Sequence, residues 1–280
     1  MQRGSLPAAT YSASFPRMIH TTAIIDSRAQ IDPTAEIGPY AIIDGPVVLA
    51  AGVKVMAHAQ LVGNVVVGAG TTIGRAAVIG GEPQDLGFDP TTDSSVVLGE
   101  HNTLREHVTI HRGSKNGSVT RIGDRNFIMA GAHLAHDVIL GNQNILANGA
   151  LLAGHIHVGN HTFIGGGAVF HQFLRIGDFC VVQGNGSFSK DIPHYCAAQR
   201  VNRVTGLNVI GLRRQGFTAE DRGAIKKLFQ LLFCEGMNLT QAVTQATQCE
   251  WPEKAQRLLD FVRAPSKKGV CPVRPGREDD

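Results

Sequence analysis

The residues with the clearest chemical potential are two histidines and an aspartate in the stretch GAHLAHD, residues 131–137. His133 and His136 are three residues apart, and Asp137 follows the second histidine directly. A histidine beside a carboxylate can act as a general base, because the carboxylate fixes the imidazole tautomer and raises its basicity. The same residues could ligate a metal, which needs three or four converging ligands, or could be isolated polar groups on the surface.

Further residues with chemical potential recur at a constant interval from this cluster. Gly154 and Gln172 lie 18 and 36 residues beyond His136. His155 lies 18 residues beyond Asp137. A glycine beside a base can leave a backbone N–H open to an oxyanion, which acyl transfer requires. The interval has a structural meaning only if the backbone repeats with the same period.

A six-residue repeat supplies that period. Aliphatic or phenylalanine side chains occupy every sixth position over residues 25–79, 98–110 and 122–188. This period differs from the 3.6 residues of a helix and from the simple alternation of an isolated strand. It is the hexapeptide signature of a parallel β-helix, in which three hexads form one coil of 18 residues. We therefore expect a mostly β protein whose periodic residues stack as the core of a prism.

Coils of 18 residues arrange side chains in rows along the prism. His136, Gly154 and Gln172 fall in one row. Asp137 and His155 fall in the adjacent row. This alignment favours a site centred on His136 over a scatter of unrelated surface histidines.

The repeat also defines the organisation of the chain. It breaks over residues 82–95 and 112–120, which we expect to leave the prism as loops, and such loops within a strict repeat are usually functional. The predicted parts are a disordered extension (1–17), a β-helix (18–190), a C-terminal helical domain (191–265) and a disordered tail (266–280).

The helical domain is predicted from a change of period in TAEDRGAIKKLFQLLFCEG. Thr218 is the expected N-cap, with Asp221 three residues later, and further helices are expected near residues 239–248 and 252–263. These helices would cover the open end of the prism, since the last coil otherwise exposes backbone groups and apolar core.

Composition excludes several classes of protein. The net charge is +3, with 26 basic and 23 acidic residues, so the balance does not favour a nucleic-acid-binding protein. No apolar run reaches the roughly 18 residues of a membrane span. The five cysteines have no metal-ligand spacing and are expected to be reduced thiols of a cytosolic protein.

The motifs in and around the repeats resemble those of one enzyme family. They are, in order, GGEPQDL, REHVTIHRGS, GAHLAHDVILGN, LAGHIHVG, AVFHQF and GLNVIGLRRQGF. These strings are similar to the motifs of UDP-N-acetylglucosamine acyltransferase, the first enzyme of lipid A synthesis. The resemblance implies a left-handed parallel β-helix with a C-terminal helical domain, assembled as a cytoplasmic homotrimer with active sites between subunits. It further implies transfer of an (R)-3-hydroxyacyl chain from acyl carrier protein to the sugar 3-hydroxyl of UDP-N-acetylglucosamine, without a metal or other cofactor.

The resemblance also assigns roles to individual residues. His136 becomes the general base, Asp137 its orienting neighbour, and Gly154 the N–H donor to the oxyanion. Gly184 takes the position that limits acyl length, where a glycine implies a long chain. The other substrate contacts implied are Gln84, Asp85, His111, His133, His155, His171, Gln172, Asn208 and Arg214. Arg214 would meet a phosphate of UDP, which suits a guanidinium.

Two features of the C-terminal part are less determined. Ile210 stands where the family usually carries an acid that contributes to nucleotide binding, so the details of uridine recognition are open. Arg213, Lys226 and Lys227 are candidates for docking the acidic carrier protein, although they could equally form a solvated helix face.

Three alternative functions follow from the same residues. The first is another β-helix acyltransferase, such as the N-acyltransferase that acts later in the pathway, but the GEPQDL loop argues against it. The second is transfer to a 3-amino UDP-sugar, which would form an amide. The third is a trimeric β-helix metal protein of the carbonic-anhydrase type, with ligands from neighbouring subunits.

Overall fold

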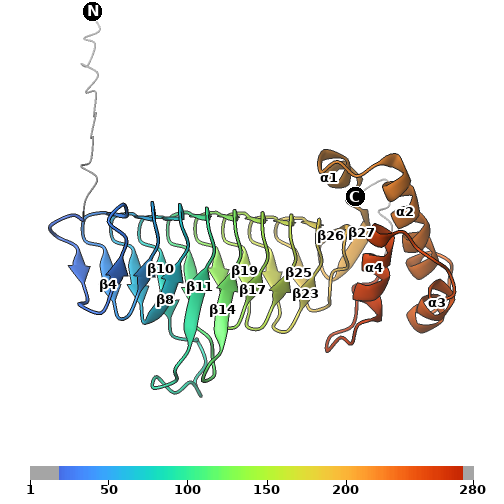
Figure 1. Ribbon diagram of the computed structural model, residues 1–280. Helices are drawn as coiled ribbons and strands as arrows, with labels where there is room; N and C mark the ends of the chain where they lie inside the picture. Colours follow the sequence, from blue (N-terminus) through green and yellow to red (C-terminus); the bar gives the residue numbers. More distant parts are fainter. Residues whose placement is uncertain (1–18, 274–280) are drawn as a thin grey trace, which may run out of the picture.

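The structure, a computed structural model, describes residues 19–273 and consists of a long prism with a group of helices at one end (Figure 1). The predicted extension, residues 1–17, lies outside the described residues. Three parallel sheets form the faces of the prism, and each strand pairs with the strand one coil further along. Within residues 19–273, no helix combines the length and apolar character that crossing a membrane requires.

The strands are short, and successive strands belong to successive faces. The first sheet contains β1 (Ile24–Ile25), β4 (Ile42–Asp44), β7 (Gln60–Val62), β10 (Val78–Gly81), β13 (Thr109–His111), β16 (His133–Leu134), β19 (Leu151–Leu152), β22 (Val169–Phe170) and β25 (Ser187–Phe188). The second sheet contains β2 (Gln30–Ile31), β5 (Val48–Leu49), β8 (Asn64–Val67), β11 (Ser95–Leu98), β14 (Val119–Ile122), β17 (Ile139–Leu140), β20 (His157–Val158) and β23 (Arg175–Ile176). The third sheet contains β3 (Glu36–Ile37), β6 (Lys54–Val55), β9 (Thr72–Ile73), β12 (Thr103–Leu104), β15 (Phe127–Ile128), β18 (Ile145–Leu146), β21 (Phe163–Ile164), β24 (Val181–Val182), β26 (Cys196–Gln199) and the antiparallel β27 (Arg203–Leu207).

The periodic residues form the core, as predicted. Every sixth-position residue from Ile37 to Phe188 is at most 4% exposed. The residue two positions earlier in many hexads also points inward, and these positions hold small or β-branched side chains such as Ala132, Ala150 and Ala168. Each hexad therefore contributes a large and a small inward side chain, which lets successive coils stack closely.

Buried polar side chains satisfy the backbone at one corner of the prism. The side-chain oxygen of Asn102 accepts from the N–H of Asn126 at 2.9 Å, and that of Asn126 accepts from the N–H of Asn144 at 2.8 Å. Asn144 in turn accepts from the N–H of Thr162 at 2.8 Å. This ladder pairs backbone groups that would otherwise be buried without a partner, so the coils that carry the site are held in fixed register.

The two predicted loops leave the prism side by side, between β10 and β11 and between β13 and β14 (Figure 1). The N–H of Asp93 donates to the side chain of Asn116 at 2.8 Å, and the N–H of Gly117 donates to the carbonyl of Asp93 at 2.7 Å. The guanidinium of Arg112 lies 4.8 Å from the ring centroid of Phe88. These contacts tie the loops together as one projecting unit.

The helices are α1 (Val209–Arg214), α2 (Ala219–Phe233), α3 (Leu239–Ala246) and α4 (Glu253–Arg263). Thr218 and Asp221 form the predicted capping box of α2. Arg257 of α4 donates to the carboxylate of Asp178 in the last coils, and this carboxylate is only 4% exposed. The helices thus dock on the end of the prism in part through an ion pair between a half-exposed arginine and a buried carboxylate.

The predicted disorder of residues 266–280 is wrong for residues 266–273. The N–H of Asp191 donates to the carbonyl of Gly269, and the N–H of Cys271 donates to the carbonyl of Asp191, both at 2.8 Å. Cys271 is 1% exposed. The segment is ordered because it pairs with the backbone of the final coil, and residues 274–280 lie outside the described residues. The third sheet also continues beyond residue 190, since β26 and β27 belong to it.

Candidate active site

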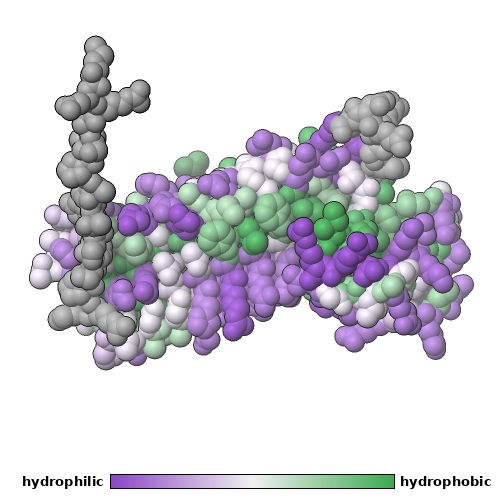
Figure 2. All heavy atoms as spheres, turned by 90° about the horizontal axis from the view of Figure 1, so that it is seen from above, coloured by the Kyte–Doolittle hydropathy of each residue, from purple (hydrophilic) through white to green (hydrophobic). Residues whose placement is uncertain are grey.

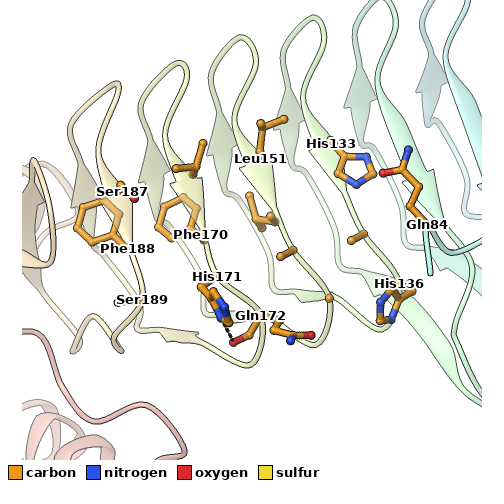
Figure 3. A pocket seen from close by; sticks show the side chains of 15 residues that line it. Gln84, His133, His136, Leu151, Phe170, His171, Gln172, Ser187, Phe188 and Ser189 are labelled. Carbon is orange, nitrogen blue, oxygen red and sulfur yellow. Dashed lines mark hydrogen bonds between the residues drawn. The ribbon is translucent and has the colours of Figure 1, made fainter. Parts of the chain in front are cut away.

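The site lies in a cleft of about 640 Å³ along the first sheet of the prism (Figure 3). The outward side chains of successive strands line its wall, including His133, Leu151, Val169 and Ser187. His136 lies at the corner that follows β16, and Gln84 extends from the first loop beside His133. One end of the cleft is therefore rich in histidine, and its wall further along is largely apolar.

His136 and Asp137 form a hydrogen-bonded pair. Nδ1 of His136 lies 2.8 Å from Oδ2 of Asp137, and the two side chains are 16% and 10% exposed. Asp137 has a φ of 60°, in the left-handed region that these corners require. A carboxylate that accepts from Nδ1–H leaves Nε2 unprotonated, so Nε2 of His136 is the atom that can remove a proton.

Asp137 is kept ionised by its hydrogen bonds. Burial favours the neutral acid, but bonds from Ser114 and His136 outweigh it and hold the pKa of Asp137 below its ordinary value. Ser114 donates both its hydroxyl, at 2.5 Å, and its N–H, at 3.1 Å, to Oδ2. The N–H of Asp137 donates to the hydroxyl of Thr120 at 2.8 Å. The carboxylate is therefore charged and fixed in orientation.

His155 lies on the next coil and shares the same carboxylate. Its Nε2 is 3.7 Å from Oδ2 of Asp137, and its ring meets that of His136 edge-on, with centroids 5.1 Å apart. The ring of Phe173 stacks on His155 at 4.6 Å and 6°. Burial lowers the pKa of His155, against the opposing effect of Asp137. Asp137 and His155 do share a row, as the 18-residue period predicted.

Two further histidines are also held neutral, namely His133, which lines the cleft, and His111, which lies behind it and is not part of the lining. Burial lowers the pKa of His133, with a smaller effect from His136. Burial also lowers the pKa of His111 to about 4, with smaller effects from His133 and His136. The rings of His111 and His133 meet edge-on at 4.8 Å, and Nδ1 of His133 bonds to the hydroxyl of Thr109 at 2.7 Å. Neutral imidazoles can both donate to and accept from the hydroxyl groups of a sugar.

Gly154 lies directly beneath the ring of His136. A Cβ at this position would lie 2.5 Å from Cε1 and 2.6 Å from Nε2 of His136. No acceptor in the described part of the chain takes the N–H of Gly154. A base and an open N–H donor are thus adjacent, which is the arrangement that acyl transfer needs.

The structure brings together some of the predicted substrate contacts and not others. Gln84, His171 and Gln172 line the cleft with His133 and His136. Asp85 is exposed and its carboxylate accepts from the N–H of Gly87 at 2.9 Å, away from the cleft lining.

Three predicted contacts lie elsewhere in the single chain. Gly184 is at a different corner, where a Cβ would lie 2.9 Å from the carbonyl oxygen of Gly166. Asn208 caps α1, with its side chain bonded to the N–H of Gly211 and the carbonyl of Phe179. Arg214 is exposed at the end of the same helix. One chain alone therefore does not join these residues to His136.

The repeat gave no sign of several residues that support the site. Ser114 comes from the second loop, which does not follow the period, and the sequence predicts only that such a loop has a function. Thr109 and Thr120 precede and follow that loop and appear in the sequence as ordinary strand residues. Phe173 belongs to the row of Asp137 and His155, so the interval of 18 could have identified it.

His136, Asp137 and His155 also offer ligand atoms that lie within 4.8 Å of one another. Such a group could hold a metal ion. In the structure each of these atoms already has a role, since Oδ2 of Asp137 accepts from Ser114 and contacts both rings. The geometry is that of a base oriented by a carboxylate.

Comparisons with known proteins identify the family. The model of UDP-N-acetylglucosamine O-acyltransferase domain 2 matches residues 191–271, and the bacterial transferase hexapeptide model matches residues 120–154. The acyl-[acyl-carrier-protein]–UDP-N-acetylglucosamine O-acyltransferase of Syntrophobacter fumaroxidans is 38% identical over 256 residues, which cover 90% of this chain and 98% of that protein. The chain belongs to the UDP-N-acetylglucosamine O-acyltransferase family.

Other relatives and solved structures agree with this assignment. The corresponding enzyme of Rippkaea orientalis is 46% identical over 199 residues, which cover 71% of this chain and 72% of that protein. The UDP-N-acetylglucosamine acyltransferase of Bacteroides fragilis superposes with a TM-score of 0.86 at 36% identity, covering 90% of this chain and 99% of that one. The enzyme of Francisella novicida gives a TM-score of 0.87 at 31% identity, covering 92% and 95%. The predicted fold, a left-handed parallel β-helix with C-terminal helices, is confirmed.

Replacing Ser114 with alanine is expected to lower kcat roughly tenfold, because a hydrogen bond to a charged group of about 1.5–3 kcal/mol is lost from Asp137. The carboxylate would then orient His136 less well. Steady-state kinetics at saturating substrates is the measurement. Ser114→Thr keeps the hydroxyl and should remain close to the wild type, and equal kcat values for Ser114→Ala and the wild type would contradict this role.

Proposed function

We propose that the chain transfers an (R)-3-hydroxyacyl group from acyl carrier protein to the 3-hydroxyl of UDP-N-acetylglucosamine, the first step of lipid A synthesis. The observation that carries the proposal is the position of His136. Its Nδ1 is held by Asp137, and its Nε2 lies over Gly154, whose N–H has no acceptor in the described residues. The donor and acceptor named for the relatives fit a site with this chemistry.

The mechanism is a direct acyl transfer. Nε2 of His136 removes the proton of the sugar 3-hydroxyl as its oxygen attacks the thioester carbon. The carbonyl oxygen becomes an oxyanion and accepts from the N–H of Gly154. When the C–S bond breaks, the thiolate of the carrier takes the proton from the imidazolium, and the base is regenerated. Asp137 stays charged throughout and stabilises the imidazolium.

The two halves of the cleft suit the two substrates. Gln84 and His133 line the cleft with His136, and the ring of His155 meets that of His136 edge-on, so these three residues would contact the sugar. The outward side chains of Leu151 and Val169, which are 42% and 37% exposed, would contact the acyl chain. Burying them against hydrocarbon stabilises the complex.

We propose that the protein is a homotrimer with sites between neighbouring subunits. Figure 2 shows hydrophobic surface along the prism toward the helical end. Large apolar side chains that lie outward on these coils are Ile139, Ile145, Leu151, Phe163 and Val169. They belong to all three faces of the prism, and a subunit interface would cover those on the faces turned toward a neighbouring chain. It would also bring the Gly184, Asn208 and Arg214 of one chain toward the His136 of another.

The assembly can be tested by mass. Sedimentation equilibrium should give three times the chain mass of 29.8 kDa, whereas Phe163→Glu should shift the protein toward monomers and reduce its activity. Thr240→Glu on α3 adds the same charge at an exposed position and should remain trimeric. A wild-type protein that sediments as an active monomer would contradict the trimer.

We propose that the carrier docks on the helical part through Arg213, Lys226 and Lys227, which are all exposed. The KM for the acidic carrier should then rise with ionic strength, because exposed charges are screened within about 10 Å at 0.1 M salt. An unchanged KM would contradict electrostatic docking. A donor of this kind also places the protein in the cytoplasm.

The function is tested by an assay with UDP-N-acetylglucosamine and 3-hydroxyacyl carrier proteins of several chain lengths. We expect an ester product and the highest rate with long chains, because the family resemblance gives Gly184 the position that limits acyl length. A product formed only with a 3-amino UDP-sugar would overturn the acceptor, and a preference for short chains would overturn the role of Gly184.

A further inference from the structure

A stack of four side chains leads from the base to the C-terminal segment. The rings of His136 and His155 meet edge-on at 5.1 Å, and Phe173 lies flat on His155 at 4.6 Å. The ammonium nitrogen of Lys267 lies 4.3 Å from the ring centroid of Phe173. His136, His155 and Phe173 come from consecutive coils, whereas Lys267 comes from a segment more than 90 residues further along the chain.

The position of Lys267 is fixed by its own segment. The hydroxyl of Ser266 accepts from the N–H groups of Lys268, at 3.1 Å, and Gly269, at 2.8 Å, which closes a tight turn around Lys267. The carbonyl of Gly269 accepts from the N–H of Asp191 at 2.8 Å and so anchors this turn to the last coil. The turn thus holds an exposed lysine against the outer end of the stack.

We propose that Lys267 is a positioning residue for acyl transfer, because its ammonium group holds Phe173 against His155 and thereby keeps His155 beside Asp137. A cation over an aromatic face is attracted by the ring quadrupole. This inference rests on the proposed function, since His155 matters only if His136 and Asp137 carry out the transfer. None of the roles implied by the sequence motifs involves Lys267 or Phe173.

The charges around His155 agree with this role. Asp137 faces it at 3.7 Å and favours the protonated ring. Lys115 of the second loop and Lys267 oppose protonation of His155, as does His136. Removal of the Lys267 charge should therefore raise the pKa of His155. Because acyl transfer in this proposal uses a neutral His155, the acid limb of the profile of kcat against pH should then move to higher pH.

The test compares Lys267→Met with Lys268→Met, which removes the same charge from the next residue. We expect Lys267→Met to lower kcat roughly fivefold, because this is the factor that corresponds to the free energy of a cation–π contact at an exposed site. The KM for the acyl carrier protein should be unchanged, and the acid limb of the kcat profile should move to higher pH. Lys267→Arg, which preserves the cation, and Lys268→Met should behave as the wild type.

The same substitution made in a Phe173→Leu variant shows whether Lys267 positions the site through that ring or contacts the substrate directly. In Phe173→Leu the ring is absent, so Lys267→Met should have little further effect if it acts through that ring. Lys267→Met indistinguishable from Lys268→Met would overturn the proposal. So would a higher KM with unchanged kcat that persists in Phe173→Leu, which would indicate a lysine that binds a substrate phosphate. An inactive wild type in the same assay would instead overturn the proposed function.

Discussion

Replacing His136 with alanine is expected to lower kcat by about a thousandfold, in the middle of the range that general bases contribute. Nε2 of His136 is the unprotonated nitrogen of a pair whose Nδ1 is held by Asp137 at 2.8 Å. His155 approaches the same carboxylate only at 3.7 Å and lies one coil away, so it cannot take over proton transfer without moving. The KM values should change little, because the base interacts most strongly in the transition state.

The measurement is steady-state transfer from the acyl carrier protein, with thermal unfolding as a check of structure. His101→Ala is the matched control, because His101 is exposed at another corner of the prism and does not line the cleft. Added imidazole should restore part of the activity of His136→Ala, since the removed ring leaves space beside Gly154. A variant that retains more than a tenth of the wild-type kcat would contradict the assignment of the base.

The core and the rows of the site were predictable because they follow one period. A coil of 18 residues fixes both which side chain points inward and which side chains stack along a face. Leu134 and Leu152 are therefore buried neighbours, and His136 lies over Gly154 on the next coil. The period alone thus predicts that His136, Asp137 and Gly154 lie together, whereas their proposed roles as base, orienting carboxylate and oxyanion donor come from the family resemblance.

Residues outside the period could not be placed in the same way. Ser114 bonds to Asp137 only because the second loop folds back on the prism. Lys267 reaches Phe173 only because a polar segment pairs with Asp191, and the sequence of that segment is typical of a disordered tail. Contacts of this kind depend on tertiary pairing, which neither composition nor local pattern encodes.

A third group of predictions depends on assembly. Gly184, Asn208 and Arg214 are recognisable from motifs, but in one chain they lie apart from the cleft that contains His136. A partner subunit would be needed to complete the site in the way the family resemblance implies. The trimer and these three contacts are consequently tested by the same variant, Phe163→Glu, through both mass and activity.

Replacing Gly154 with alanine is expected to lower kcat by about a hundredfold with little change in stability, because the methyl group displaces the base. The added Cβ would lie 2.5 Å from Cε1 and 2.6 Å from Nε2 of His136, closer than any tolerated contact. The backbone of Gly154 is not among those with positive φ, so alanine is accepted there without backbone strain. The imidazole can swing toward the open cleft, but it then loses its hydrogen bond to Asp137.

A double-mutant cycle shows whether the base mediates this effect. Alanine retains the N–H of residue 154, so a loss of activity would come from the displaced ring and not from a missing oxyanion donor. In the His136→Ala background there is no ring to displace, and Gly154→Ala should cause almost no further loss. If the two losses instead multiply, the glycine acts independently of His136, and the close fit of the ring over Gly154 would not be the reason that a glycine is required.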